Sequence, residues 1–229
     1  MSKIRLDDRL KAVAGLVRNG KRVADIGTDH GYLVAYLVEN NICPCGIAAD
    51  LRKGPLENAR QTVIQQGLSE KIELILSDGL EKISKDACDD IVLAGMGGNL
   101  IAEILEKAPW IMNERINIVA QPMTHAEVLR QYFADNGFEI NKEVTATDGK
   151  RLYCVMSAGY TGKKLKHSAS YIYTGEIKPD NELNRKYPRL AGIPFDSDRK
   201  LMTTVNKIDG KNVVKVIVIP KRLINIVVK

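Results

Sequence analysis

Glycine and carboxylate residues alternate in one short segment, Asp25-Ile-Gly-Thr-Asp-His-Gly31, which joins an apolar stretch to a helical stretch. Glycine lets a backbone turn tightly and approach a ligand closely. The segment lacks the G-x-G-x-x-G spacing that brings a pyrophosphate onto a helix N-terminus. Its carboxylates, Asp25 and Asp29, suit a cationic ligand such as the sulfonium and amino groups of S-adenosylmethionine. The alternative is a plain tight turn with a helix-capping aspartate.

Two further carboxylates follow expected strands. Asp50 lies about 20 residues beyond the glycine segment, a spacing at which an acidic side chain can accept hydrogen bonds from ribose hydroxyls. Asp78, within Ser77-Asp-Gly79, could accept from the exocyclic amine of an adenine. The alternatives are a helix N-cap for Asp50 and an ordinary turn for Asp78.

A second glycine cluster, Gly95-Met-Gly-Gly98, closes another expected strand. Ligands of open α/β folds bind at the carboxyl ends of the strands, and glycines there leave room for a substrate. Close packing of the following helix is the alternative reason for glycine. His30, beside Asp29, is the histidine candidate for function, because His125 and His167 have no evident partner.

Short apolar strands alternate with helices along the segment that carries these residues. This alternation predicts a mostly parallel sheet covered on both faces. A hairpin with its turn at Thr147-Asp-Gly149 follows. The fold class expected is α/β, namely a doubly wound, seven-stranded, class I Rossmann-like methyltransferase with a terminal antiparallel hairpin. The hairpin disfavours the alternative function, an NAD-linked oxidoreductase. We expect strands at 22–26, 45–50, 72–76, 90–94, 116–120, 138–146 and 152–158, and helices at 6–17, 32–39, 54–66, 101–107 and 124–136, the last with Thr124 as its N-cap.

Composition limits the remaining classes. The chain shows no secretory signal and no segment near the roughly 18 apolar residues of a membrane span, so we expect a cytoplasmic protein without a membrane partner. Its four cysteines include Cys43-Pro-Cys45, but no second pair completes a tetrahedral metal site. We therefore expect structural thiols and no metal. No protein partner can be inferred.

Charge is divided unevenly along the chain. Residues 161–229 carry 15 Lys and Arg against six Asp and Glu, whereas residues 1–160 have a net charge of −3. The helical and strand periodicity also stops after Gly159. We therefore predict a domain over 1–160 and an atypical basic extension over 161–229, which could contact RNA or simply be solvated.

Several motifs together resemble the TrmK family of bacterial tRNA adenine-N1 methyltransferases, which act on adenine 22. The motifs cover residues 1–160 in the family's order: Leu6-Asp-Asp-Arg-Leu10, Asp25-Ile-Gly-Thr-Asp-His30, Gly54-Pro-Leu-Glu-Asn-Ala59, Asp78-Gly-Leu80, Ala94-Gly-Met-Gly-Gly98 and Gln121-Pro122. The resemblance implies S-adenosylmethionine as cofactor and tRNA as substrate.

The resemblance also implies residue roles. It implies that Asp29 and His30 lie around the methionine moiety of the cofactor. Because adenine becomes cationic when its N1 is methylated, we predict that Asp29 and His30 are catalytic, with Asp29 stabilising that charge or accepting the exocyclic proton. The implied cofactor-binding residues are Arg9, Asp25, Gly27, Asp29, His30, Asp50, Asp78, Gly79, Gly95 and Met96. The implied substrate-binding residues are Gly97, Gly98, Gln121 and Pro122.

The C-terminal part departs from that family, whose members continue into a helical domain. Residues 174–210, including Glu182–Arg189 and Ile193–Val205, resemble part of the nucleotide-binding domain of P-type calcium ATPases, in which the position of Phe195 stacks on adenine. No phosphorylation motif Asp-Lys-Thr-Gly occurs. A cofactor-binding but catalytically silent RNA-binding or vestigial protein is therefore the alternative function.

Overall fold

The computed structural model describes residues 4–148, 151–175, 189–196, 201–208, 211–213, 215–219 and 222–226. The chain divides into two compact units, Met1–His167 and Ser168–Lys229. Residues after the last strand of the large sheet remain tied to the first unit, since Thr161 N donates to Gly137 O and Leu165 N donates to Ala134 O.

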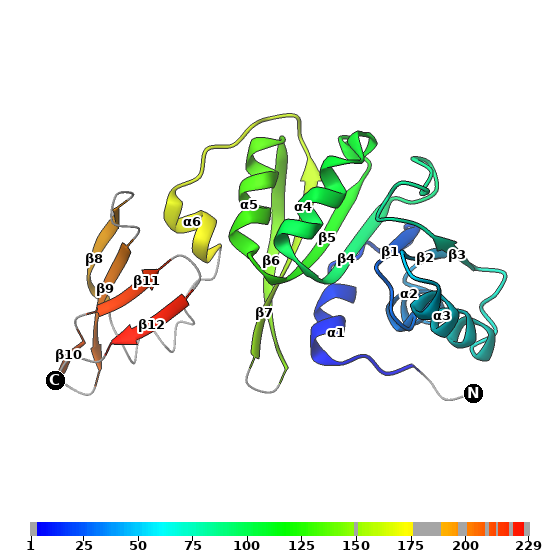
Figure 1. Cartoon of the computed structure of the whole chain (residues 1–229), viewed down its shortest axis with the longest axis horizontal. Helices are drawn as coiled ribbons and strands as arrows, with labels where there is room; N and C mark the ends of the chain where they lie inside the picture. Colours follow the sequence, from blue (N-terminus) through cyan, green and yellow to red (C-terminus); the bar gives the residue numbers. More distant parts are fainter. Residues whose placement is uncertain are drawn as a thin grey trace. The chain divides into compact units, whose positions relative to one another are not determined.

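A seven-stranded sheet organises the first unit (Figure 1). Its order is β3-β2-β1-β4-β5-β7-β6, with β1 to β5 parallel and β7 antiparallel to both β5 and β6. This arrangement confirms the predicted fold class. The strands are β1 (Val23–Ile26), β2 (Gly46–Asp50), β3 (Ile72–Leu76), β4 (Asp90–Gly97), β5 (Asn117–Thr124), β6 (Phe138–Asp148) and β7 (Arg151–Tyr160).

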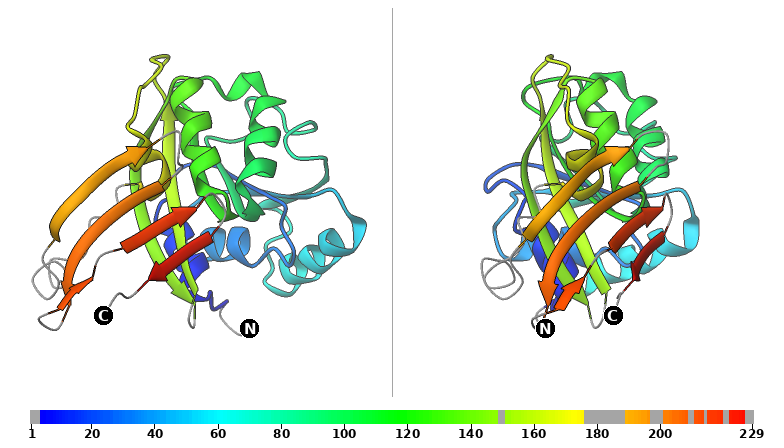
Figure 2. Two further views of the ribbon diagram at one scale, coloured as in Figure 1. Left: turned by 60° about the vertical axis from the view of Figure 1, so that its left-hand side comes forward. Right: turned by 90° about the vertical axis from the view of Figure 1, so that its left-hand side faces the viewer.

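Helices cover both faces of the sheet because successive strand residues point to opposite sides. Val92 packs into a core with the three helices α1 (Asp8–Ala14), α2 (Tyr32–Glu39) and α3 (Lys53–Gln65). Its neighbours Ile91 and Leu93 pack into a second core with α4 (Gly98–Glu106) and α5 (Ala126–Asp135). Figures 1 and 2 show α4 and α5 side by side. A 3₁₀ turn, η1 (Pro109–Ile111), precedes β5.

The first helix is shorter than predicted. It begins after Asp7, whose Oδ1 accepts a hydrogen bond from Leu10 N at 2.6 Å, and it ends at Ala14 rather than Val17. Gly15 follows the helix, and Leu16 N and Val17 N bond three residues back, so the chain tightens into turns. The predicted bounds of α2 and β3 are confirmed.

The ends of β4 and β5 also differ from prediction. Both strands continue further, so that Gly97 pairs with Thr124, and α4 starts directly at Gly98. Thr124 is therefore a strand residue and not the N-cap of α5. The N-cap position belongs to His125, which has a left-handed φ of 57° and makes no side-chain capping bond. Register shifts on either side of Met96 bend the end of β4.

The described part of the second unit contains α6 (Ala169–Thr174) and five strands. A three-stranded antiparallel sheet has the order β10 (Lys211–Val213), β9 (Leu201–Ile208), β8 (Arg189–Asp196). A separate antiparallel pair joins β11 (Lys215–Ile219) and β12 (Arg222–Ile226). Residues 182–188 and the side chain of Phe195 lie outside the described residues. None of the helices in the described part of the chain is long and apolar enough to cross a membrane.

Candidate functional site

A pocket of about 350 Å³ opens at the carboxyl ends of β1 and β4. Loops that follow parallel strands gather at this edge, where open α/β folds bind ligands. Five of the predicted site residues share this cavity. The residues that line it are Arg9, Leu10, Asp25, Gly27, Thr28, Asp29, Gly31, Tyr32, Leu33, Arg52, Ala94 and Gly95.

Asp25 lies on β1 and is buried beneath the pocket. Burial raises the pKa of Asp25 to about 6, a hydrogen bond from Thr28 acts in the opposite direction, and the Asp50 carboxylate raises the pKa again. Among the described residues, the groups that set this pKa include no cation. A cationic ligand in the pocket would therefore stabilise the ionised form of Asp25.

The glycine segment after β1 is tied to β2. Gly27 N and Thr28 N both donate to Ala49 O, at 2.8 and 3.0 Å. Gly27 has a φ of 76°, and a Cβ there would collide with the terminal methyl group of Met96. Glycine is thus needed at this position for its conformation and for the approach of Met96. The contact places Met96 next to the pocket residue Gly27.

Asp29 and His30 are brought together. His30 Nε2 lies 3.4 Å from Asp29 Oδ2, and both side chains are exposed. The His30 ring stacks on Tyr32 with centroids 5.2 Å apart and planes 11° apart. The stack holds the imidazole beside the Asp29 carboxylate at the mouth of the pocket.

Gln121 lies at the end of β5 and is fully buried. Its Oε1 accepts hydrogen bonds from Arg9 Nη1 at 2.8 Å and from Gly95 N at 3.1 Å. Its Nε2 donates to Pro122 O at 3.2 Å. Both ends of the amide are therefore occupied by protein groups, and the side chain connects α1 to the end of β4.

Asp50 ends β2, and Arg52, two residues later, lines the pocket. Asp50 is buried, and its Oδ1 accepts from Arg52 N at 2.7 Å. Arg52 Nε is 3.6 Å from the same oxygen, but its side chain is mostly exposed. The carboxylate thus closes a local turn at the start of α3 and also lies near Asp25, consistent with its effect on that residue's pKa.

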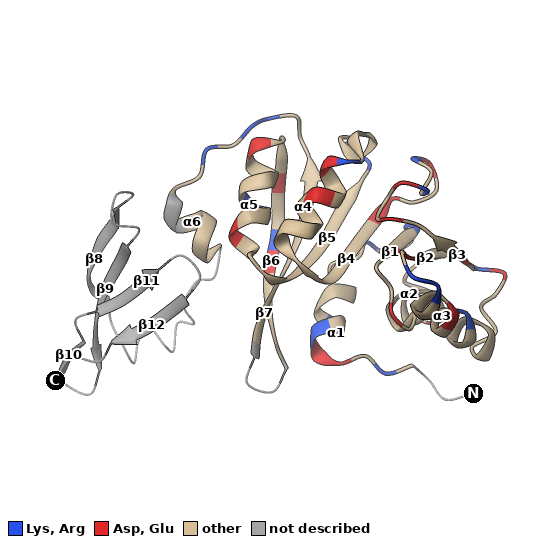
Figure 3. Ribbon diagram, viewed as in Figure 1, with Lys and Arg blue, Asp and Glu red and all other residues tan. Residues whose placement is uncertain are grey.

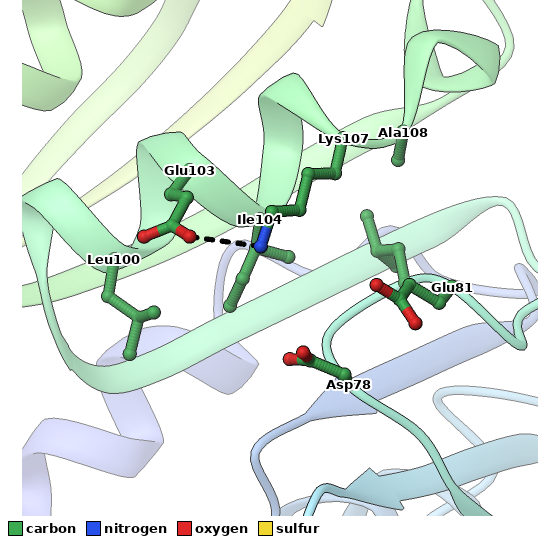
Figure 4. A pocket seen from close by; sticks show the side chains of 8 residues that line it. Asp78, Glu81, Leu100, Glu103, Ile104, Lys107 and Ala108 are labelled. Carbon is green, nitrogen blue, oxygen red and sulfur yellow. Dashed lines mark ion pairs between the residues drawn. The ribbon is translucent and has the colours of Figure 1, made fainter.

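Asp78 lines a second, smaller cavity of about 210 Å³ between the loop after β3 and α4 (Figure 4). Glu103 pairs with Lys107 across one turn of α4, with Nζ and Oε1 2.9 Å apart. Leu100 and Ile104 supply apolar walls. The loop that carries Asp78 is bonded to the end of β2, since Ser77 N donates to Asp50 O at 3.0 Å.

The glycines at the start of α4 have packing roles. A Cβ at Gly98 would collide with the carbonyl oxygen of His125, and one at Gly97 would lie 3.2 Å from Thr124 Oγ1. Gly79 likewise brings its loop against Ile104, which a Cβ would approach to 2.8 Å. Close backbone packing therefore accounts for these glycines, whatever else they contact.

The amino ends of the strands contain a network of hydrogen-bonded charges. Asp90, the first residue of β4, is fully buried and accepts from Arg18 Nε at 2.7 Å, Arg18 N at 2.8 Å and Asn117 Nδ2 at 3.0 Å. Ser157 Oγ donates to Asn117 Oδ1 at 2.9 Å. Next to it, hydrogen bonds from Arg22 lower the pKa of Asp89 to about 2.

Another buried charge cluster joins α5 to the hairpin. Arg130 Nη2 donates to Glu143 Oε1 at 2.5 Å, and Cys154 Sγ donates to the same oxygen at 2.7 Å. Burial raises the pKa of Cys154 to about 12. Sequence patterns give no signal for this cluster, because its members lie on three separate elements.

The cysteines are free thiols. Cys43 and Cys88 are buried, and burial raises the pKa of both thiols to about 12. In the described ranges, no group of three or more His, Cys, Asp or Glu side chains is arranged to hold a metal ion.

Sequence reasoning did not identify some residues of the pocket wall, namely Leu10, Thr28, Tyr32, Leu33 and Arg52. Tyr32 carried a usable signal, because it is an aromatic residue on the first turn of the helix that follows the glycine segment. Thr28 carried a weaker signal, its place inside the glycine segment. In the structure its Oγ1 accepts from Gly31 N at 3.1 Å and closes that segment. Leu10 and Leu33 are apolar helix residues, and sequence alone does not distinguish such residues from those of the core.

Comparison with known proteins supports the predicted relationship. Residues 6–156 match the family described as methyltransferase domain. The tRNA (adenine(22)-N(1))-methyltransferase of Bacillus subtilis (strain 168) is 36% identical over 158 residues, which cover 69% of this chain and 66% of that protein. The chain thus spans just under two thirds of that relative's length.

A predicted resemblance to calcium ATPases also has a counterpart. Calcium-transporting ATPase 1 of Lactococcus lactis subsp. lactis (strain IL1403) is 28% identical over 182 residues, which cover 72% of this chain and 20% of the ATPase. The match therefore extends over more of the chain than the predicted residues 174–210.

Among solved structures, Mycoplasma capricolum TrmK in complex with the cofactor product S-adenosyl-homocysteine is 32% identical, with a TM-score of 0.66. The match covers 73% of this chain and 74% of that one. The family match, the sequence identities and the structural similarity show that the chain belongs to the methyltransferase-domain family and, within it, to the TrmK family.

Proposed function

We propose that the chain is an enzyme that transfers a methyl group from S-adenosylmethionine to N1 of an adenine in tRNA, adenine 22 by its likeness to the B. subtilis relative. The observation that carries the proposal is the pocket at the carboxyl ends of β1 and β4, which the carboxylates Asp25 and Asp29 line. These carboxylates suit the positive charge of a sulfonium cofactor. The M. capricolum relative was solved with the product of that cofactor.

The remaining cofactor contacts follow the edge of the sheet. Asp50 is placed to accept hydrogen bonds from ribose hydroxyls, and Asp78 to accept from the adenine amine. Arg9 faces the pocket from α1, where its guanidinium can bind the carboxylate of the methionine moiety. We also assign Gly27, Gly79, Gly95 and Met96 to this path. Gly27 and Gly95 line the pocket, Met96 lies against Gly27, and Gly79 follows Asp78.

The chain's own residues carry the chemistry through placement and charge. The cofactor supplies an electrophilic methyl group. Adenine N1 has a free lone pair, so no base is needed before it attacks, and the enzyme mainly aligns the two reactants. Asp29, at the pocket mouth, is placed to stabilise the positive charge that develops on the base or to accept its exocyclic proton. His30, 3.4 Å from that carboxylate, orients it.

The target adenine must leave its stack in tRNA, at a cost of a few kcal/mol. Gly97 and Gly98 lie at the turn from β4 into α4, next to the pocket residue Gly95. Gln121 and Pro122 lie beneath them at the end of β5, where both are buried. We propose that Gly97 and Gly98 border the space for the base, and that the buried Gln121 and Pro122 support that space from below. A tRNA substrate also implies a cytoplasmic location.

The experiment combines the full chain, unmodified tRNA and S-adenosylmethionine labelled in its methyl group, followed by nucleoside analysis. We expect label in 1-methyladenosine, and we expect Asp29→Ala to lose it while still binding the cofactor. If the cofactor binds but no nucleoside is labelled, the silent RNA-binding alternative replaces the enzyme. If the cofactor does not bind, the function proposed for the pocket is wrong.

A further inference from the structure

The segment that begins with α1 is attached to the sheet at two places. Arg18, beyond the end of α1, bonds to Asp90 at the amino end of β4. Arg9, within α1, bonds to Gln121 at the carboxyl end of β5. The two attachments differ in strength, because Arg18 meets a carboxylate whereas Arg9 meets a neutral amide. At the pocket end, the sheet residue that bonds to Arg9 therefore carries no charge.

Gln121 also supports the strand beside it. Ala94 pairs with Gln121, but the next registered pair joins Met96 to Pro122, so Gly95 is left out of the regular ladder. Gln121 Oε1 accepts the Gly95 N–H at 3.1 Å and so satisfies a donor that the bulge leaves over. Gly95 has a φ of 83°, a conformation that glycine adopts readily and that turns its N–H toward this acceptor.

The same oxygen fixes Arg9 relative to Gly95. A Cβ at Gly95 would lie 3.7 Å from Arg9 Nη1, so the guanidinium sits over the exposed glycine at the pocket wall. One acceptor atom therefore links the cation on α1 to the bulge on β4, and the Asp7 carboxylate, 3.9 Å from Arg9 Nη2, is a charged neighbour of that cation. Gln121 itself has no exposed surface with which to touch a ligand.

We propose that Gln121 is a positioning residue for cofactor binding and methyl transfer, acting through Arg9 and the Gly95 backbone rather than by contacting the target base. This inference rests on the proposed function of the pocket. A cofactor carboxylate bound by Arg9 and a methyl group presented past Gly95 would both shift if the amide were removed. Loss of one buried hydrogen bond to a charged group costs about 1.5–3 kcal/mol, or roughly ten- to hundredfold in an equilibrium constant.

The test uses the full chain and four variants: Gln121→Met, Arg9→Met, the double variant, and Ser157→Ala. Methionine keeps the volume of glutamine and removes both acceptor bonds. Ser157→Ala removes a buried hydrogen bond at the other edge of the sheet and serves as the matched control. For each, the dissociation constants of S-adenosylmethionine and S-adenosyl-homocysteine are measured by calorimetry, together with kcat, KM for tRNA, melting temperature and exchange of the Gly95 amide by NMR.

We expect Gln121→Met to raise the cofactor dissociation constant about tenfold or more. Gly95 amide exchange should speed up, kcat should fall, and KM for tRNA should change little. In the double variant with Arg9→Met, the loss of cofactor affinity should be smaller than the sum of the losses in the two single variants. Ser157→Ala should lower the melting temperature and leave the dissociation constants unchanged. Additive losses, unchanged Gly95 exchange, or an effect on KM for tRNA alone would overturn the inference. Gly95 exchange needs no cofactor, so a failure of the proposed function is distinguishable.

Discussion

The two edges of the large sheet contain the same residue types in opposite states. At the amino edge, Asp89 and Asp90 each accept hydrogen bonds from an arginine. At the carboxyl edge, Asp25 is buried, and the described groups that set its pKa include no cation. The pKa of Asp89 is lowered to about 2, whereas that of Asp25 is raised to about 6. The contrast separates carboxylates that stabilise the fold from one that is prepared for a positive ligand.

Backbone geometry does not follow this division. Positive φ angles occur at Gly27 and Gly95 near the carboxyl edge, but also at Gly20, Gly67 and Gly137, which precede strands at the amino edge. Figure 3 shows acidic and basic residues distributed over the first unit, so net charge alone does not distinguish the edges. The difference lies in whether each carboxylate already has its partner. Substitutions at the two edges should therefore have different consequences for stability and binding.

The largest effect is expected from Asp90→Ala. It would leave Arg18 and Asn117 without their shared acceptor, and breaking a buried ion pair costs about 3–5 kcal/mol. Urea unfolding should show this loss in the free energy of unfolding, with cofactor affinity unchanged in the folded fraction. Asp90→Asn, which keeps an acceptor, should lose less. A folded protein of normal stability that no longer binds cofactor would contradict the division between the edges.

Asp25→Asn should stabilise the fold and weaken cofactor binding, whereas Asp90→Ala should destabilise the fold and leave binding unchanged. The pKa of Asp25 is raised in the folded state, so its favourable contribution to stability is present below about pH 4 and is lost as pH rises through about 6. Removing the charge should raise the free energy of unfolding at pH 7.5 by up to about 3 kcal/mol. Cofactor affinity should fall at least tenfold. Chemical unfolding and calorimetry on one sample measure both, and a destabilised variant would count against the assignment.

Gly98→Ala tests whether the glycine cluster serves packing. A Cβ would collide with the carbonyl oxygen of His125, and overpacking of this kind costs about 1–3 kcal/mol. The matched control is Gly54→Ala on α3, where a Cβ meets nothing within 4 Å. That substitution should stabilise the protein by about 0.5–1 kcal/mol. Thermal unfolding of the two variants should give shifts of opposite sign, and equal shifts would refute the packing role.

Cofactor affinity should depend on pH through the same carboxyl group. Binding of a cation favours ionised Asp25, so affinity should be constant above about pH 7 and fall below about pH 6, by up to tenfold per pH unit. Calorimetry between pH 5 and pH 8 would follow the change, with Asp25→Asn as the flat control. A profile that is equally steep in the variant would assign the titration to another group.

The smallest effect is expected at the basic segment after β7. Lys163, Lys164 and Lys166 are exposed and follow the amino edge, since Leu165 N bonds to Ala134 O near the end of α5. Replacing all three with alanine should change tRNA affinity less than about threefold. The slope of log affinity against log salt concentration should change by less than about 0.7–0.9, the value for one phosphate contact. If the slope instead fell by the equivalent of two or more phosphate contacts, RNA would also bind at this edge.

Elements with regular patterns were predictable. The apolar run of α2 begins after a left-handed glycine, and its bounds were as predicted. The pockets' carboxylates were recognisable because each follows a strand that ends at the same edge. Ends decided by tertiary contacts were not: β4 continues through its glycines because Gly97 pairs with Thr124 on β5, a contact that spacing along the chain does not encode.

Partners across long sequence distances were also out of reach. Gln121 and Arg9 are 112 residues apart, and Arg18 and Asp90 are 72 apart. A sequence shows that each residue is polar within an apolar surrounding, but not which donor meets which acceptor. For the same reason Asp25 and Asp78, both predicted cofactor contacts, could not be assigned by sequence to different cavities.

The burial of the thiols has a practical consequence for labelling. The thiolate is the reactive form, and pKa values raised to about 12 keep Cys43, Cys88 and Cys154 protonated at pH 8. Cys45 is half-exposed and lies beside Gly46, where β2 begins. A maleimide dye should therefore attach there first. A fluorophore at this position reports on the molecule from the edge opposite the pocket, without a cysteine having to be added or removed.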